Sequence, residues 1–154
     1  MIRTPFALRL LAVGMAATAA ACGCSAERTP DRSAADAVVS KPPSETLSPL
    51  FQMALPNIKG KTFTSAIVDF PPAARAAPHR HGKAFVYAYV LDGSVTSKLA
   101  GEPVRTYHQG QNWFERPGAH HVLTANISRT KPAKLLVVFI SHTGDKLKID
   151  DPPK

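Results

Sequence analysis

The order of apolar and polar residues beyond position 60 is typical of short β-strands. Residues 61–70 (KTFTSAIVDF) and 83–91 (KAFVYAYVL) are rich in the β-branched and aromatic types that favour extended backbone. Pro71 and Pro72 end the first run, because proline has no backbone N–H to donate within a sheet. No segment after residue 50 keeps a helical period of apolar residues. The pattern therefore predicts an all-β fold.

Turn residues divide the rest of the chain into further strands. Asp92 and Gly93 form a typical hairpin turn signal. Later strands are expected at residues 94–99, 104–107, 111–115, 121–125 and 134–141. The last of these is predicted to be buried on both faces because its apolar residues are continuous, and both stripes of the 83–91 run are likewise assigned to the core. Short strands at this spacing predict a single sandwich or barrel.

By composition the 154 residues divide into three parts. Residues 1–24 read as a signal peptide, because Arg3 and Arg9 give a positive start, an apolar run follows, and small alanines close it. That run is shorter than the roughly 20 residues of a membrane-spanning helix. Residues 25–49 contain Ala, Ser, Pro and charged residues without an aromatic, which predicts a flexible linker. Residues 50–152 then form one folded domain.

The end of the apolar run leaves two modes of export open. Ala-Ala-Ala before Cys22 fits a small-x-small cleavage site, and it also resembles a bacterial lipoprotein box whose cysteine is lipidated. Ala19 stands where such boxes favour leucine. Acyl chains on Cys22 would anchor the protein by burying their methylenes in the bilayer. We therefore expect a bacterial, exported protein, either free in the periplasm or anchored by lipid.

The basic charge of the chain does not point to nucleic acid. The net charge is +8, from 19 Lys+Arg against 11 Asp+Glu. Some of this charge lies in the signal-like segment, and the rest is scattered without a basic run or interleaved aromatics. We interpret it as a solvated surface. No nucleic-acid partner is expected, and contact with a membrane is expected only through a lipid anchor.

Two histidines have the spacing of a shared metal site. His79 and His81 stand two residues apart, so on a strand both side chains point to the same face. Imidazole is a common ligand of zinc, copper, iron and nickel. The alternative is that these rings are buried and hydrogen-bonded to backbone. The other histidines, His108, His120 and His142, are expected in surface or packing roles.

Two spaced motifs around these histidines resemble those of the cupins, one over residues 73–93 and one over residues 110–121. The matching residues are His79, His81 and Gly93 in the first motif and Gly110, Gly118 and His121 in the second. Ala73 and Arg116 depart from the usual glycine and proline. The resemblance covers roughly residues 60–141. It implies a double-stranded β-helix, the jelly-roll barrel of the small single-domain type-2 cupins, which include quercetin-dioxygenase-like members.

The resemblance implies that His79, His81 and His121 hold one divalent metal ion, with Fe, Mn, Ni, Cu and Zn all open. The family's fourth ligand is a glutamate, and Val86 stands at its position. Glu115 is the candidate replacement, because cupins carry an apolar residue there and a buried carboxylate needs a partner. A salt bridge to a neighbouring arginine and plain exposure are the alternatives for this residue.

Two functions from different classes follow from these expectations. The first is a metal-dependent small-molecule enzyme, dioxygenase-like or of another chemistry, because three imidazoles leave coordination positions open. The second is a non-catalytic cupin that binds or senses a small molecule at the cell envelope, favoured by the missing carboxylate at Val86. Trp113 is expected either to line a substrate cavity or to pack in the core. Frequent dimers among cupins imply a homodimer.

Overall fold

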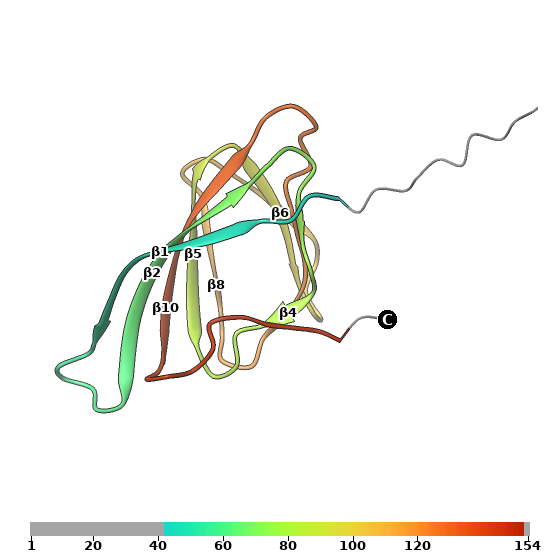
Figure 1. Cartoon of the computed structure of the whole chain (residues 1–154). Coiled ribbons are helices and arrows are strands. Elements are labelled where there is room, and N and C mark those ends of the chain that lie inside the picture. Colours follow the sequence, from blue (N-terminus) through green and yellow to red (C-terminus); the bar gives the residue numbers. More distant parts are fainter. Residues whose placement is uncertain (1–41, 153–154) are drawn as a thin grey trace, which may run out of the picture. The chain divides into compact units, whose positions relative to one another are not determined.

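The computed structural model describes residues 42–152, which form β-strands and contain no helix that could cross a membrane (Figure 1). The strands are β1 (Thr46–Ala54), β2 (Lys61–Phe70), β3 (Arg75–Ala76), β4 (His79–Arg80), β5 (Phe85–Asp92), β6 (Ser94–Leu99), β7 (Arg105–His108), β8 (Asn112–Glu115), β9 (His120–Ala125), β10 (Ala133–His142) and β11 (Ile149–Asp150). The expected signal peptide, the lipidation residue Cys22 and most of the expected linker lie outside the described residues.

Two antiparallel sheets make up the domain. The first has the strand order β1-β2-β10-β5-β8, and the second has the order β11-β4-β9-β6-β7, with β3 paired to β9. Both sheets contribute to one buried apolar cluster, for example through Phe70 and Phe139 of the first sheet and Val95 of the second. Strands that are distant in sequence are neighbours in space, as in the pairing of β2 with β10. This arrangement confirms the all-β jelly-roll expectation.

The inner face of the first sheet is buried and mostly apolar, whereas its outer face is only half-buried or exposed. Leu135, Val137 and Phe139 of β10 are buried, whereas the residues between them are half-buried. The prediction that this strand is buried on both faces is therefore wrong. The assignment of both stripes of β5 to the core is wrong in the same way, since Phe85 is exposed while Val86 is buried. The outer stripes are apolar because Val, Tyr and Phe favour strands, not because a second layer covers them.

The first strand begins earlier than the sequence pattern indicates. β1 starts at Thr46, inside residues 25–49 that were expected as linker, and it pairs with β2 as far as Ala54. Most of its residues are exposed, so the strand shows no alternation of apolar and polar positions. Backbone pairing at the sheet edge holds it, and Leu47 packs against the core. The pairing brings the residue just before β1, Glu45, onto the domain.

The two glycine positions of the first motif, 73 and 93, both have left-handed backbone. Gly93 has a φ of 72°, and a Cβ there would lie 2.6 Å from the carbonyl oxygen of Pro132, so the turn requires glycine. Ala73 has a φ of 60° and is the one non-glycine residue with positive φ in residues 42–152. It stands where the motif has glycine. The local conformation is kept although the glycine is lost, at a cost of about 1 kcal/mol.

A buried amide fastens the loop that follows β9. Asn126 is 2% exposed, and its Nδ2 shares its hydrogens among the carbonyl oxygens of Phe70, Pro71 and Lys131 at 2.8–3.2 Å. Its Oδ1 accepts a hydrogen bond from the backbone N–H of Ser128 at 3.0 Å. The side chain therefore ties the end of β2 to the loop before β10 with every polar atom paired.

Candidate metal centre

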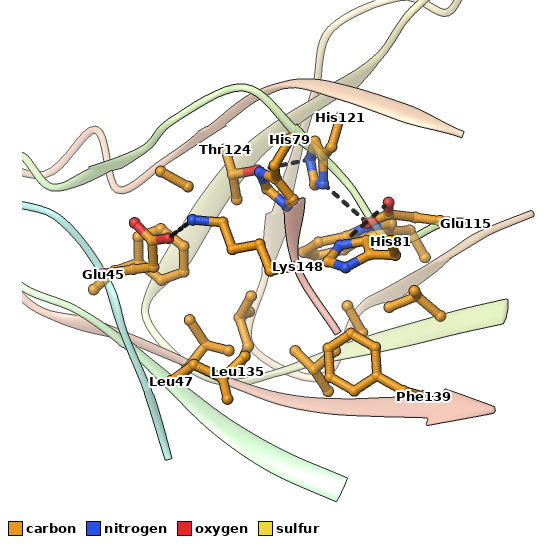
Figure 2. Close-up of a pocket in the computed structure, with 17 residues that line it drawn as sticks. Glu45, Leu47, His79, His81, Glu115, His121, Thr124, Leu135, Phe139 and Lys148 are labelled. Atoms are coloured by element: carbon orange, nitrogen blue, oxygen red, sulfur yellow. Dashed lines mark hydrogen bonds and ion pairs between the residues drawn. The ribbon is translucent and has the colours of Figure 1, made fainter. Parts of the chain in front are cut away.

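Three histidines from neighbouring strands meet inside the barrel. His79 on β4 pairs in register with His121 on β9, and His81 follows β4 directly. Each ring offers a nitrogen that lies within 4.8 Å of those of the other two. Figure 2 shows the three imidazoles gathered at one side of a pocket. The structure thus brings together the three histidines that the sequence motifs single out.

Two of the rings are oriented by backbone carbonyls. Nδ1–H of His79 donates to the carbonyl oxygen of Ala77 at 2.7 Å, and Nδ1–H of His81 donates to the carbonyl oxygen of Leu147. A carbonyl oxygen only accepts, so the proton of each neutral ring lies on Nδ1. The Nε2 atoms of His79 and His81 are left unprotonated, which is the form that binds a metal.

The third ring is oriented by hydroxyl groups. Nε2 of His121 lies 2.8 Å from Oγ of Ser97 and 2.8 Å from Oγ1 of Thr124. Outer partners of this kind fix the orientation of a metal-binding imidazole. The opposite nitrogen of His121, Nδ1, faces the carboxylate of Glu115.

Glu115 enters the cluster from a strand next to the one that the cupin motif uses. It lies on β8 and pairs in register with Val86 on β5, so the two side chains share a face of the sheet. Glu115 is 3% exposed. Its Oε1 lies 2.9 Å from Nδ1 of His121, and its Oε2 lies 3.8 Å from Nε2 of His81. Nε1–H of Trp113 donates to Oε1 at 3.3 Å.

This placement excludes both alternatives considered for Glu115. The side chain is not exposed, and its ion-pair partners among residues 42–152 are histidines rather than arginines. Glu115 thus places a carboxylate on the strand next to Val86 and directly opposite it, at a backbone spacing of about 4.8 Å.

Two atoms of the cluster are buried without a hydrogen-bond partner, and no other side-chain atom in the described part of the chain shares this state. They are Oε2 of Glu115 and Nδ1 of His121. The 2.9 Å approach of Nδ1 to Glu115 is an ion-pair distance without hydrogen-bond alignment. An unpaired buried polar atom costs about 1–3 kcal/mol. A divalent metal ion fits the cluster, because imidazole nitrogens and a carboxylate oxygen are suitable donors for it.

Burial sets the protonation states of the cluster. It lowers the pKa of His79 to about 4, and it also lowers the pKa of His81. Burial by itself would raise the pKa of Glu115, but the adjacent imidazoles of His121 and His81 outweigh it and lower that pKa. At neutral pH the lowered pKa values favour neutral imidazoles at His79 and His81 and an ionised carboxylate at Glu115, as metal binding requires.

The histidines and Glu115 line a cavity of about 60 Å³. Most of the remaining wall is apolar, as at Phe70, Leu135 and Phe139. Trp113 lines the cavity and also belongs to the buried apolar cluster, so it packs in the core as one interpretation of the sequence expected, and its role toward a substrate stays a prediction. Since one water occupies roughly 30 Å³ in the liquid, the space suits a ligand of few heavy atoms.

Two charged residues of the cavity wall were missed by the sequence analysis. Nζ of Lys148 lies 2.5 Å from Oε1 of Glu45 and 2.9 Å from Oδ1 of Asp150. Figure 2 shows the Lys148 side chain extending across the pocket toward Glu45. Both lie in polar terminal segments without a motif. Only the pairing of β1 with β2 and of β11 with β4 brings them to the cavity.

The remaining histidines lie outside the cluster. Nε2 of His120 lies 2.7 Å from Oδ2 of Asp151, so this half-buried ring has an ion-pair partner. His108 and His142 are exposed, with hydrogen bonds to Ser94 and Lys61 respectively. Packing and surface roles, as expected from the sequence, describe all three.

The fold and the site together define the class of this protein. It is a small antiparallel jelly-roll barrel whose interior holds a histidine cluster suited to a metal ion. Residues 66–139 match the family model of the cupin domain. This part of the chain is therefore a cupin domain. No curated protein sequence matches the chain significantly.

Solved structures of other cupins have the same fold. The DMSP lyase DddQ from Ruegeria pomeroyi DSS-3 is 21% identical with a TM-score of 0.52, over 60% of this chain and 44% of the lyase. The Cnp3 cupin domain of Schizosaccharomyces pombe is 13% identical with a TM-score of 0.54, over 68% of this chain and 66% of that one. Recombinant oxalate oxidase in complex with glycolate is 19% identical with a TM-score of 0.55, over 72% of this chain and 57% of the oxidase. The chain thus spans less than two thirds of these proteins, and the likeness concerns the fold.

Proposed function

We propose that this cupin is a metal-dependent enzyme that acts on a small molecule, with one divalent ion held by His79, His81, His121 and Glu115. The main supporting observation is that two buried atoms of the cluster, Oε2 of Glu115 and Nδ1 of His121, have no hydrogen bond although their side chains lie at ion-pair distance. A buried polar atom without a hydrogen bond is unfavourable, and a cation bound at the cluster would coordinate both atoms.

The residues around the cluster have separate roles in this proposal. Ala77, Leu147, Ser97 and Thr124 orient the imidazoles through their outer nitrogens. Trp113 and the apolar wall exclude water from one side of the cavity. When bound, the ion would act as a Lewis acid that polarises a substrate oxygen.

The reaction type is not given by the fold, because one fold hosts many chemistries. Among the similar structures are a DMSP lyase and an oxalate oxidase, so lyase and oxidase chemistry both occur on related barrels. We therefore propose that dioxygenase-like oxidation and elimination are the first reactions to assay. Iron, manganese, nickel, copper and zinc are the candidate ions for the donor set.

One observation favours a second function, a non-catalytic binding or sensing module. The cavity of about 60 Å³ is far smaller than the roughly 300–1,000 Å³ of drug-sized ligand pockets. A module that captures one small ligand needs no further space for a second reactant.

Turnover separates the two functions. Metal-loaded protein is incubated with mixtures of small oxygenated compounds in air, and the mixture is followed by proton NMR, with the His79→Ala/His81→Ala variant as control. The enzyme proposal predicts new product signals only with the parent protein. Ligand line broadening without any new signal would contradict it and favour the binding module.

We also propose export from a bacterial cell, either into the periplasm or with a lipid on Cys22. The support is the sequence of residues 1–24, with its positive start, apolar run and small residues before the cysteine. Mass spectrometry of the protein from a bacterial host tests it: a mature chain that begins at or soon after Cys22 is expected, and an unprocessed Met1 would contradict export. A homodimer stays a prediction.

A further inference from the structure

The cavity has a single lysine or arginine in its wall among the described residues, and this cation has a carboxylate beside it. Lys148 lines the cavity, and its Nζ is held between Oε1 of Glu45 and Oδ1 of Asp150. The two carboxylates differ in position. Glu45 lines the cavity and its side chain is 9% exposed, whereas Asp150 is 56% exposed and does not line the cavity. Asp150 therefore holds Lys148 from the solvent side and Glu45 holds it from the cavity side.

The backbone around Glu45 is held by a hydrogen bond from the N–H of Arg75 to the carbonyl oxygen of Pro43 and by the start of β1, but the Glu45 side chain has few contacts. Glu45 precedes β1 and belongs to no strand. Besides Lys148, its side chain has one partner, the hydroxyl of the adjacent Ser44. Its carboxylate can leave the cavity without the loss of any sheet pairing, whereas Lys148 would keep Asp150 as a partner.

The position of Lys148 relative to the histidine cluster is fixed by its neighbour in the chain. The carbonyl oxygen of Leu147 accepts the hydrogen bond that orients His81. The next residue, Lys148, extends across the pocket toward Glu45 (Figure 2). A ligand that spans the cavity would therefore meet the metal ligands at one end and the ammonium group at the other.

We propose that Lys148 is the anion subsite for a substrate carboxylate, and that Glu45 occupies this subsite as the chain's own carboxylate when no substrate is bound. This inference rests on the proposed function, and it names the substrate class as a short-chain carboxylate with an apolar body. When a substrate carboxylate replaces that of Glu45, Lys148 keeps an anionic partner. Substrate entry therefore does not leave a partly buried charge unpaired. Departure of the Glu45 side chain also enlarges a cavity of about 60 Å³.

Binding of matched four-carbon probes tests the subsite. Butyrate, butyramide and butan-1-ol are titrated by NMR into zinc-loaded protein, and zinc content is measured in the same samples. The parent is expected to prefer butyrate over both neutral probes. Glu45→Gln is expected to bind butyrate about tenfold more tightly, because the competing carboxylate is gone, with little change for butyramide.

Changes at Lys148 give the decisive comparison. Lys148→Met is expected to lose the preference for butyrate, and Lys148→Arg is expected to keep it. Lys134→Met is the matched control, because Lys134 pairs with Asp69 outside the cavity wall, and it should leave the preference unchanged. Equal binding of butyrate by the parent and Lys148→Met would overturn the subsite, as would the absence of any gain in Glu45→Gln. Protein that retains zinc but shows no preference for butyrate overturns the subsite alone. Protein that takes up no zinc but prefers butyrate supports the subsite and overturns the metal proposal alone.

Discussion

Two buried polar groups of this barrel, the Asn126 side chain and the histidine–glutamate cluster, differ in one respect that separates structure from function. Asn126 is 2% exposed and Glu115 is 3% exposed, so burial does not distinguish them. All polar atoms of Asn126 have hydrogen-bond partners in the backbone. In the cluster, Oε2 of Glu115 and Nδ1 of His121 have none.

Complete and incomplete hydrogen bonding distinguish a structural side chain from a candidate binding site. A polar side chain whose bonds are complete stabilises the folded chain without any ligand. A buried polar group without hydrogen-bond partners destabilises the folded chain until a ligand binds to it. Asn126 is therefore a structural residue, and the cluster of Glu115 with its histidines is a candidate ligand site. Substitutions in the two places are expected to have effects that differ in their dependence on metal.

The largest effect is expected from Asn126→Ala. The substitution leaves the carbonyl oxygens of Phe70, Pro71 and Lys131 without this donor, and the free energy of unfolding is expected to fall by about 4 kcal/mol. The fall is expected to be the same for metal-free and metal-loaded protein, measured by urea unfolding. A loss of unfolding free energy seen only with metal-loaded protein would contradict the purely structural role of Asn126.

Acidification is expected to affect the cluster almost as strongly. Burial lowers the pKa of His79 from 6.5, the ordinary value of a histidine, to about 4 in the folded protein, so the unfolded chain takes up the proton first. Metal-free protein should be fully stable above about pH 6.5 and should lose about 3 kcal/mol as the pH falls to about 4.

The other groups of the cluster change stability in the same direction. The pKa values of His81 and Glu115 are also lowered, so their protonation likewise destabilises the fold. Lys148 lines the same cavity, but its pKa is raised and it stays charged throughout this pH range. Thermal melts of metal-free protein between pH 7 and pH 4 measure the loss. A His79→Gln control should show a smaller slope, and an equal slope in both proteins would refute the assignment to His79.

Glu115→Gln is expected to act on metal affinity rather than on the fold. The amide keeps the shape of the side chain but removes the anionic donor, so the affinity for zinc should fall by about 10- to 100-fold. The stability of metal-free protein should change by less than about 1 kcal/mol, since a buried charge is removed at the same time. Calorimetric zinc titration with a matched urea melt measures both. Unchanged zinc affinity would exclude Glu115 as a ligand.

The smallest effect is expected at Ala73, in the loop between β2 and β3. Ala73 has a φ of 60°, and its backbone N–H donates to the carbonyl oxygen of Ser128. Ala73→Gly relieves the left-handed strain but adds freedom to the unfolded chain, so the net gain should be about 0.5 kcal/mol. A shift of the thermal midpoint to lower temperature would show that this conformation is not strained.

Much of the fold and part of the site were predictable from the sequence. Strand composition and turn residues placed β2 and β6, and the motif spacing selected the histidines that meet at the cluster. The outer stripe of β10 was misjudged because strand propensity and burial produce the same apolar residues. The edge strand β1 was missed because it is held by backbone pairing, which leaves no pattern in its side chains.

The proximity of Glu115 to Val86 could be recognised only from the register of the sheet. The sequence shows that the motif glutamate is replaced by Val86 and that Glu115 is an unusual carboxylate. Only the pairing of β5 with β8 places the second residue directly opposite the first. Glu45 and Lys148 required the same kind of information, because they come from the two ends of the domain.

The most direct test of the metal centre is the metal content of the protein itself. The chain from Glu27 onward and its His79→Ala/His81→Ala variant are purified without a histidine tag and measured by inductively coupled plasma mass spectrometry. We expect about one equivalent of iron, manganese, nickel, copper or zinc in the parent and none in the variant. A parent that stays metal-free after incubation with each of these ions would contradict the account, and the histidine cluster would then be a structural feature like Asn126.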